Sequence, residues 1–236
     1  MVSIGTCVLG LNPRVALAVD DGCSREEVDA AMTAGADMLE FRIDRFQDTS
    51  RAYVLDVLGR FNGFPRIGTI RSSQEGGGWK GGEEARLDLF AAIMPHVEAV
   101  DIEIASSLIN RQVVECAACQ GKTIIGSFHD FHGTPGPEVF EAYIQQARDL
   151  GVTIIKFAAH CSTRAELCQL AGLLLNNTDK HLIVLGMGNE GRISRFLFPA
   201  LGSLVTYTFL GTPSAPGQAS LDETLHILDL LYERNK

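Results

Sequence analysis

Residues 38–44 read Met-Leu-Glu-Phe-Arg-Ile-Asp, and their alternation indicates the fold. In a β-strand successive side chains point to opposite faces, so Glu40, Arg42 and Asp44 share one face while the apolar residues between them share the other. A strand in an open, doubly wound sheet is covered by helices on both sides and is apolar on both faces. A barrel strand packs only its outer face on helices and can carry charges at the inner mouth. The stretch therefore favours a barrel over the open sheet, which is the alternative.

The same organisation extends along the whole chain. Short apolar, β-branched runs alternate with helical patterns, and Asp101 and Glu103 alternate with isoleucines in the same way. We expect eight strands, at residues 15–19, 38–43, 66–71, 99–104, 123–128, 153–157, 182–187 and 204–209. A helix candidate follows each strand, and no linker interrupts the chain. Eight such units in 236 residues predict an α/β fold made of one (β/α)8 TIM barrel domain, residues 1–236.

Helix boundaries carry their own signals. Ser24 and Glu27 form a capping box, with Ser24 as the N-cap. Pro137 suits the first position of a helix. Gly35 and Gly151 stand where helix C-caps belong, each just before a strand. These signals support helices that alternate with the expected strands.

The chain carries 20 Lys and Arg residues against 29 Asp and Glu residues, a formal net charge of −9. This acidic balance argues against nonspecific binding to nucleic acid or to an anionic membrane, because both are polyanions. No apolar run approaches the ~20 residues of a membrane span. The N-terminal apolar stretch also lacks the basic region that begins a secretory signal. We therefore expect a cytoplasmic protein that binds neither nucleic acid nor membrane.

The six cysteines do not indicate a disulfide framework or a metal site. Cys116 and Cys119 form a CxxC pair inside a helical pattern, not at a helix start as in redox motifs. No second CxxC completes a zinc site. A chain of this size can bury an adequate core without staples. We expect reduced cysteines.

Lys156 stands in an otherwise apolar strand, Thr-Ile-Ile-Lys-Phe-Ala-Ala, at residues 153–159. Desolvation there lowers the pKa of an amine and makes it nucleophilic near neutral pH. A lysine on the inner face of a barrel is the usual means of forming a Schiff base with a carbonyl substrate. The alternative is a structural lysine whose ammonium reaches an edge.

His129 ends the fifth expected strand, where catalytic groups of barrels collect. Histidine is the common general acid/base near pH 7, and a core or rim histidine is the alternative. His129 and His132 also form an HxxH, but a turn at residues 133–135 follows, so we expect no metal.

Arg71 closes the third expected strand, and Glu75 follows it beside glycines. A carboxylate on such a loop can reach a histidine, and a solvated loop charge is the alternative.

Two loops near the C-terminus offer polar groups. Residues 186–191 match GxGxxG, but they lie in the seventh unit and no acidic residue follows at the ribose position, so we reject a dinucleotide site. Arg195, just beyond, could bind a carboxylate. Residues 211–218 form a loop whose Ser214 and Gln218 suit a lid that hydrogen-bonds a hydroxylated ligand, with a plain connector as the alternative.

Seven motifs occur in order along the chain: Glu-Phe-Arg-Ile-Asp (40–44), Thr-Ile-Arg-Ser-Ser-Gln-Glu-Gly-Gly (69–77), Asp-Ile-Glu (101–103), Ser-Phe-His-Asp-Phe (127–131), Ile-Lys-Phe-Ala (155–158), Gly-Arg-Ile-Ser-Arg (191–195) and Ser-Ala-Pro-Gly-Gln (214–218). In this order they resemble the type I 3-dehydroquinate dehydratases of the shikimate pathway. The resemblance covers nearly the whole chain. It implies a (β/α)8 barrel that is commonly a homodimer, a lyase that uses no metal or cofactor, and a small-molecule substrate, 3-dehydroquinate.

The resemblance also implies roles for individual residues. It makes Lys156 the Schiff-base lysine, His129 the general acid/base and Glu75 the partner of that histidine. The substrate-binding residues that it implies are Glu40, Arg42, Arg71, Arg195, Ser214 and Gln218. We place Asp101 and Glu103 in a buried polar layer under the site.

The implied reaction is a syn dehydration of 3-dehydroquinate to 3-dehydroshikimate. Lys156 attacks the C3 ketone, and His129 removes the C2 proton and protonates the departing C1 hydroxyl. We expect the arginines to form a locally basic mouth and to depress the pKa of Lys156 further. Two alternatives stay open: another Schiff-base-forming barrel lyase or aldolase, acting on a sugar phosphate, and a catalytically inactive barrel that binds a ligand or a partner.

Overall fold

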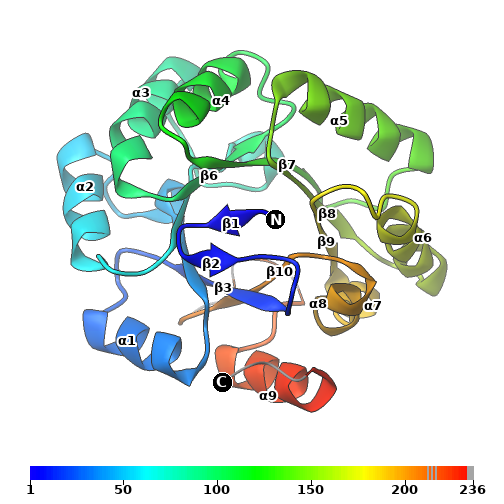
Figure 1. Cartoon of the computed structure of the whole chain (residues 1–236). Helices are drawn as coiled ribbons and strands as arrows, with labels where there is room; N and C mark the ends of the chain where they lie inside the picture. The colour runs from blue at the N-terminus through cyan, green and yellow to red at the C-terminus, as the bar shows by residue number, and fades with distance from the viewer. Residues whose placement is uncertain (212, 214, 216, 233–236) are drawn as a thin grey trace.

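The structure, a computed structural model, describes residues 1–211, 213, 215 and 217–232. Eight parallel strands form one sheet in the order β10-β3-β4-β5-β6-β7-β8-β9. They are β3 (Arg14–Val19), β4 (Met38–Arg42), β5 (Arg66–Thr69), β6 (Ala99–Glu103), β7 (Thr123–Asp130), β8 (Ile154–His160), β9 (Leu182–Met187) and β10 (Val205–Phe209). Figure 1 shows the sheet curling into a barrel with the helices outside it. The predicted (β/α)8 TIM barrel is confirmed.

The two ends of the sheet meet between β9 and β10. The Leu204 N–H donates to the Leu182 carbonyl at 2.9 Å. The Ser203 hydroxyl accepts from the Val184 N–H at 3.0 Å and donates to the Val184 carbonyl at 3.4 Å. A side chain thus takes the place of ladder hydrogen bonds at this seam.

Helices follow the strands, with one exception to the expected pattern. The long helices are α1 (Arg25–Ala34), α2 (Arg51–Arg60), α3 (Glu83–Ile93), α4 (Asn110–Cys119), α5 (Pro137–Leu150), α6 (Arg164–Leu175) and α9 (Leu221–Leu231). Between β9 and β10 the helical segment is broken into α7 (Gly188–Gly191), α8 (Ser194–Leu197) and the 3-10 helix η4 (Phe198–Leu201). Three further 3-10 turns are η1 (Ile43–Arg45), η2 (Ser73–Glu75) and η3 (Met94–His96).

The helix boundaries read from the sequence are confirmed. Ser24 accepts the Glu27 N–H, and the Glu27 carboxylate accepts the Ser24 N–H, which completes the capping box of α1. Pro137 is the first residue of α5. Gly35 and Gly151 follow α1 and α5 with φ values of 130° and 80°, a region that favours glycine because it has no Cβ.

An antiparallel hairpin that the sequence analysis did not predict, β1 (Ser3–Ile4) and β2 (Cys7–Val8), covers one end of the barrel (Figure 1). It packs on an apolar layer to which every barrel strand contributes one inward residue: Ala16, Met38, Ile67, Ala99, Ile125, Ile154, Ile183 and Val205. Because this layer and the hairpin fill the N-terminal end, a polar site can open only at the C-terminal end of the strands.

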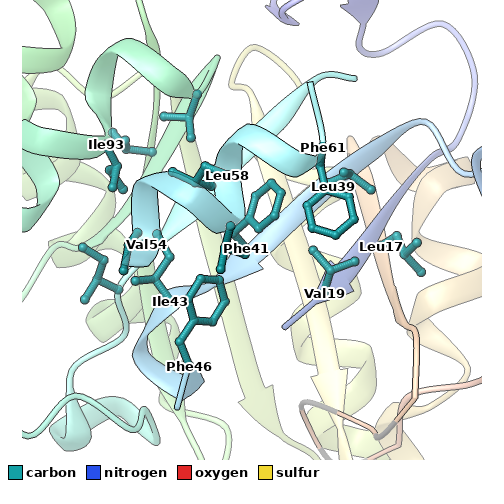
Figure 2. Close-up of a cluster of buried hydrophobic side chains, with 14 of the residues drawn as sticks. Leu17, Val19, Leu39, Phe41, Ile43, Phe46, Val54, Leu58, Phe61 and Ile93 are labelled. Carbon is teal, nitrogen blue, oxygen red and sulfur yellow. The ribbon is translucent and has the colours of Figure 1, made fainter. Parts of the chain in front are cut away.

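The outer face of the sheet packs on helices, as the alternation in residues 38–44 predicts. Leu39 and Phe41 of β4 are fully buried against α2, where Figure 2 shows them beside Leu58 and Phe61. The rings of Phe41 and Phe61 lie 5.7 Å apart between centroids. Burying each such side chain contributes roughly 1.5–3 kcal/mol, so this outer core is a main source of stability for the barrel. The charged residues that alternate with them therefore face inward.

Candidate active site

The inner face of the barrel becomes polar two residues beyond the apolar layer, because inward positions recur with a period of two. The buried polar residues at this level are Glu40, Thr69, Asp101, Ser127, Lys156 and Tyr207. Above them a cavity opens at the C-terminal end of the strands. The predicted site residues that line it are Glu40, Arg42, Arg71, Glu75, His129, Lys156, Arg195 and Gln218. Ser214, the remaining predicted residue, lies outside the described residues.

Lys156 lies in the middle of β8, and its side chain is only 5% exposed. Its Nζ donates to Asp101 Oδ2 at 2.9 Å and lies 3.6 Å from Glu40 Oε1. It also lies over the ring of Tyr207, 4.1 Å from the centroid, in cation–π geometry. Negative charge and an electron-rich ring face thus surround the amine.

The expected depression of the Lys156 pKa is wrong. Burial lowers this pKa, but Asp101, Tyr207 and Glu40 together raise it by more, so the net pKa lies above its usual value. The arginine that was expected to repel the proton, Arg71, is itself neutralised by carboxylates. Lys156 is therefore an ammonium in the free protein, and it must lose a proton before it can act as a nucleophile.

Arg71 lies just beyond the end of β5, which stops at Thr69, two residues earlier than predicted. Its guanidinium donates to Asp101 Oδ1 at 2.7 Å and to Glu103 Oε1 at 2.9 Å. It also donates to Ser127 Oγ at 2.6 Å. Arg71 and Lys156 together hold the pKa of Asp101 far below its usual value, against the opposing effect of burial. Asp101 was expected in a buried polar layer under the site. It instead contacts Lys156, the candidate nucleophile, directly.

A second arginine supports this network from outside the barrel. Arg86 of α3 is fully buried, and its Nη2 lies 2.9 Å from Glu103 Oε2 and 2.6 Å from Ser106 Oγ. Ser106 in turn donates to Glu103 Oε2 at 2.9 Å. Both oxygens of Glu103 are therefore held, and Glu103 fixes the position of Arg71.

His129 and Glu75 form the pair that was predicted. Glu75 Oε2 lies 2.9 Å from His129 Nδ1 and accepts the His129 backbone N–H at 2.9 Å. Burial raises the pKa of Glu75 to about 8, although Arg71 opposes this. Burial and the positive charges of Arg71 and Lys156 lower the pKa of His129 well below its usual value. The imidazole is therefore neutral at pH 7.

The glycines after Glu75 let its loop approach the site. Gly76 has φ of 74°, and a Cβ on it would lie 2.4 Å from the Phe131 ring. A Cβ on Gly77 would lie 2.0 Å from the Arg71 carbonyl oxygen. Only glycine fits at such a close approach, so this sequence places Glu75 against His129.

The remaining cations are not equivalent. Arg42 is held by Asp44, with contacts of 3.0 and 2.8 Å. Arg195 of α8 is buried and donates to the carbonyls of Gly217 at 3.1 Å and Tyr207 at 3.3 Å. Burial, with the neighbouring Arg192, lowers its pKa to about 10, and no carboxylate among the described residues offsets this.

The expectation that all four cations together make the cavity mouth basic is therefore wrong. Arg42, Arg71 and Lys156 each have a carboxylate partner. Of the four cations that were expected to converge, Arg195 is the one for which the described residues provide no counter-charge. A buried guanidinium in this state is a strong site for a ligand carboxylate.

The motifs that were set aside have structural explanations. A Cβ on Gly186 would lie 2.7 Å from Gly191 Cα, so these glycines of the GxGxxG stretch allow β9 and α7 to pack closely. Cys116 and Cys119 lie on α4, and the six cysteines are free thiols. His132 is exposed. In the described ranges no group of three His, Cys, Asp or Glu residues is arranged to hold a metal ion.

Comparison with known proteins matches this arrangement to one family. The model of the family described as Type I 3-dehydroquinase matches residues 18–235. The chain belongs to the type I 3-dehydroquinase family. It is 34% identical to 3-dehydroquinate dehydratase of Thermodesulfovibrio yellowstonii over 200 residues, which are 84% of this chain and 86% of that protein. It is 31% identical to the enzyme of the same name from Methanococcoides burtonii, over 98% of this chain and 100% of the relative.

Solved structures of 3-dehydroquinate dehydratases share the fold over its full length. The crystal structure of the Geobacillus kaustophilus protein has a TM-score of 0.90 at 26% identity and covers 100% of this chain and 97% of its own. The crystal structure of the Aquifex aeolicus protein has a TM-score of 0.81 at 31% identity, and the match covers 93% of this chain and 99% of that chain. In this member of the family, no described helix combines the length and the apolar character needed to cross a bilayer.

Tyr207 and Arg86 of this type I 3-dehydroquinase are among the residues of the site region that were not predicted from the sequence. Tyr207 lines the cavity beside Lys156, and the alternation of Val205, Tyr207 and Phe209 was a signal that could have placed it inward. Arg86 lies on a helix, and nothing in its sequence surroundings distinguishes it from an exposed arginine.

Proposed function

We propose that this chain catalyses the dehydration of 3-dehydroquinate to 3-dehydroshikimate through a Schiff base on Lys156. The observation that carries the proposal is the presence, in one cavity, of a buried lysine, a histidine–carboxylate pair and a buried arginine that can take a ligand carboxylate. These are the groups that a Schiff-base elimination on a carboxylated keto-substrate needs. Family membership supports the same reaction.

The first step is addition of Lys156 to the C3 ketone. The Nζ ammonium gives up a proton, and we assign Glu40, 3.6 Å away, as its acceptor because Asp101 is held ionised by Arg71 as well. The nitrogen lone pair then forms the bond to C3. Loss of water from the carbinolamine gives an iminium, which withdraws electrons from the neighbouring C2–H bond.

The second step is the elimination. Glu75 occupies Nδ1 of His129, which leaves Nε2 to act on the substrate. The neutral ring removes the C2 proton and then protonates the C1 hydroxyl, which leaves as water. One group that serves both proton transfers acts on one face of the ring, which fits the syn course that the resemblance implies. Hydrolysis of the iminium releases the product and restores Lys156.

Substrate binding rests on the cations and the polar residues of the mouth. Arg195 pairs with the substrate carboxylate, because it is buried and no carboxylate among the described residues neutralises it, although two backbone carbonyls hold it in place. The ring hydroxyls are assigned to Glu40, Arg42, Arg71, Ser214 and Gln218. No cofactor or metal enters the proposed reaction.

The setting of the enzyme is also part of the proposal. A homodimer in the cytoplasm, in the pathway to aromatic amino acids, is what the resemblance implies. Large apolar side chains on α9, on α8 and just before α8 are exposed, and they offer a surface for a second copy of the chain: Ile193, Leu197, Leu230 and Leu231. Free cysteines are typical of a reducing compartment. Sedimentation analysis would test the dimer, and a monomer at micromolar concentration would contradict it.

A decisive test combines turnover with covalent trapping. The purified protein is mixed with 3-dehydroquinate, and the conjugated enone of the product is followed by ultraviolet absorbance. Borohydride is then added and the peptides are mapped by mass spectrometry. We expect the enone and an adduct on Lys156. Turnover of a phosphorylated ketose but not of dehydroquinate would support the aldolase alternative, and binding without turnover would support an inactive barrel.

A further inference from the structure

The hydroxyl of Tyr207 is a buried polar group that finds no partner among the described residues. Tyr207 is 4% exposed, and its hydroxyl oxygen is buried and has no hydrogen bond within the part of the chain that the structure describes. An unpaired hydroxyl in this position costs stability, whereas a phenylalanine would fill the same space without that cost. A buried polar group of this kind calls for an explanation, and for one that lines a cavity a ligand can supply the missing partner.

The position of Tyr207 links this hydroxyl to the reacting amine. Tyr207 lies on the inner face of β10 and lines the same cavity as Lys156. The Lys156 Nζ sits over the ring face, 4.1 Å from its centroid, and it is near enough to the hydroxyl to lower the pKa of the phenol, although it makes no hydrogen bond of ordinary geometry to the hydroxyl oxygen. The reacting amine and the phenol hydroxyl therefore belong to one cavity, and a carbonyl bound there for attack by Nζ would lie near both.

The hydroxyl is also held in its protonated form. Burial raises the pKa of Tyr207, and the negative charges of Glu40 and Asp101 raise it further, while Lys156 opposes them. The net pKa is well above the usual value. At neutral pH the phenol is therefore a hydrogen-bond donor, and the residues that the structure describes provide no acceptor for it.

We propose that Tyr207 is a further catalytic residue, whose hydroxyl donates to the oxygen of the carbonyl that Lys156 attacks and relays a proton to it. This inference rests on the proposed function. It gives that oxygen a dedicated donor while His129 is kept for the C2 proton and the C1 hydroxyl. A donor aimed at an oxygen that gains charge in the transition state is an effective catalyst because it is already in place.

The step balances without another reactant. The Nζ lone pair forms the N–C bond, and the π pair of the carbonyl moves to its oxygen. That oxygen takes the phenol proton, and the phenolate takes the proton that the nitrogen must shed. The product is a neutral carbinolamine, and Tyr207 returns to its starting state.

The test is the Tyr207→Phe variant, which keeps the ring and removes only the hydroxyl. Rapid mixing with 3-dehydroquinate is followed by a borohydride quench at short times, and mass spectrometry measures the Lys156 adduct. We expect adduct formation to slow by about tenfold to a thousandfold. We also expect an equal or higher melting temperature, because the unpaired hydroxyl is gone. Tyr53→Phe is the control, since its hydroxyl donates at the surface to Asp21 at 2.9 Å.

The outcomes separate this inference from the proposed function. Wild-type turnover with an unchanged adduct rate in Tyr207→Phe would overturn the inference alone. A slower variant with a lowered melting temperature would make Tyr207 a structural residue and would also overturn it. A wild-type protein that forms no product and no adduct would overturn the proposed function and, with it, the role of Tyr207.

Discussion

Lys156 Nζ donates a hydrogen bond of 2.9 Å to Asp101 Oδ2, deep in the barrel. The other oxygen of Asp101 accepts from Arg71 at 2.7 Å and from Ser127 at 2.6 Å. One buried carboxylate thus contacts both buried cations, while Glu103 also pairs with Arg71 and Glu40 lies near Lys156, so the charge states of these groups depend on one another. The candidate nucleophile is stored as an ammonium, and its loss of a proton must accompany substrate binding.

Replacing Asp101 with Asn tests this shared counter-charge. The substitution keeps the size of the side chain but leaves Arg71 and Lys156 buried without it, so we expect the free energy of unfolding to fall by about 3–5 kcal/mol. Urea denaturation followed by circular dichroism measures the change. Asp179→Asn is a matched control, because that carboxylate pairs with Lys180 in solvent. An Asp101→Asn protein as stable as the control would contradict the central role of this carboxylate.

Replacing Lys156 with Ala tests the nucleophile. Without an amine no iminium forms, and we expect kcat to fall by about a thousandfold or more while dehydroquinate still binds. Turnover is read from the enone absorbance, and binding from isothermal titration calorimetry. Lys180→Ala, which removes a lysine outside the cavity, should keep full activity. Near-normal turnover by Lys156→Ala would remove the centre of the proposed mechanism.

The pair of His129 and Glu75 predicts how the rate depends on pH. Burial raises the pKa of Glu75 to about 8 and lowers the pKa of His129. Below pH 8 the Glu75 carboxyl is therefore protonated. The base that removes the C2 proton is His129 Nε2 with Glu75 ionised. We therefore expect kcat/KM to be low at pH values below 8 and to rise as the pH passes through about 8.

Replacing Glu75 with Gln provides the matching test of that pH profile. The variant has no carboxyl to titrate, so the acid limb of kcat/KM should move to lower pH, toward the depressed pKa of His129. The maximal rate should fall by about tenfold to a hundredfold, since the amide orients the ring less well. An acid limb that stays in place would show that another group controls it.

Replacing Arg195 with Lys tests the binding of the substrate carboxylate. Lysine keeps the charge but loses the planar fork, so we expect KM to rise by about tenfold to a hundredfold with a smaller change in kcat. Steady-state kinetics on dehydroquinate measures both. Arg192→Lys is the control, because Arg192 is half exposed and lies 3.8 Å from Glu223 at the surface. An unchanged KM in Arg195→Lys would assign the carboxylate to another cation.

The sequence by itself determined the barrel and the end of it that carries the site. A strand turns successive side chains to opposite faces, so the alternation in residues 38–44 was enough to put Glu40 inside and Phe41 under a helix. The order of the strands placed His129 and Lys156 at one mouth, because parallel strands end on the same side.

Only the tertiary structure decided which charges meet. Asp101 and Lys156 are 55 residues apart, and their contact depends on the register of three neighbouring strands. Burial is the largest single influence on the Lys156 pKa and lowers it, but Asp101 at 2.9 Å, together with Tyr207 and Glu40, raises it by more and so reverses the expected direction. Closure of the barrel between β9 and β10 likewise brings the Tyr207 ring against the amine, and among the described residues its hydroxyl has no hydrogen-bond partner. Periodicity along a strand fixes which face a residue occupies, but electrostatic energies depend on distances across strands, which the chain sets only when the barrel closes.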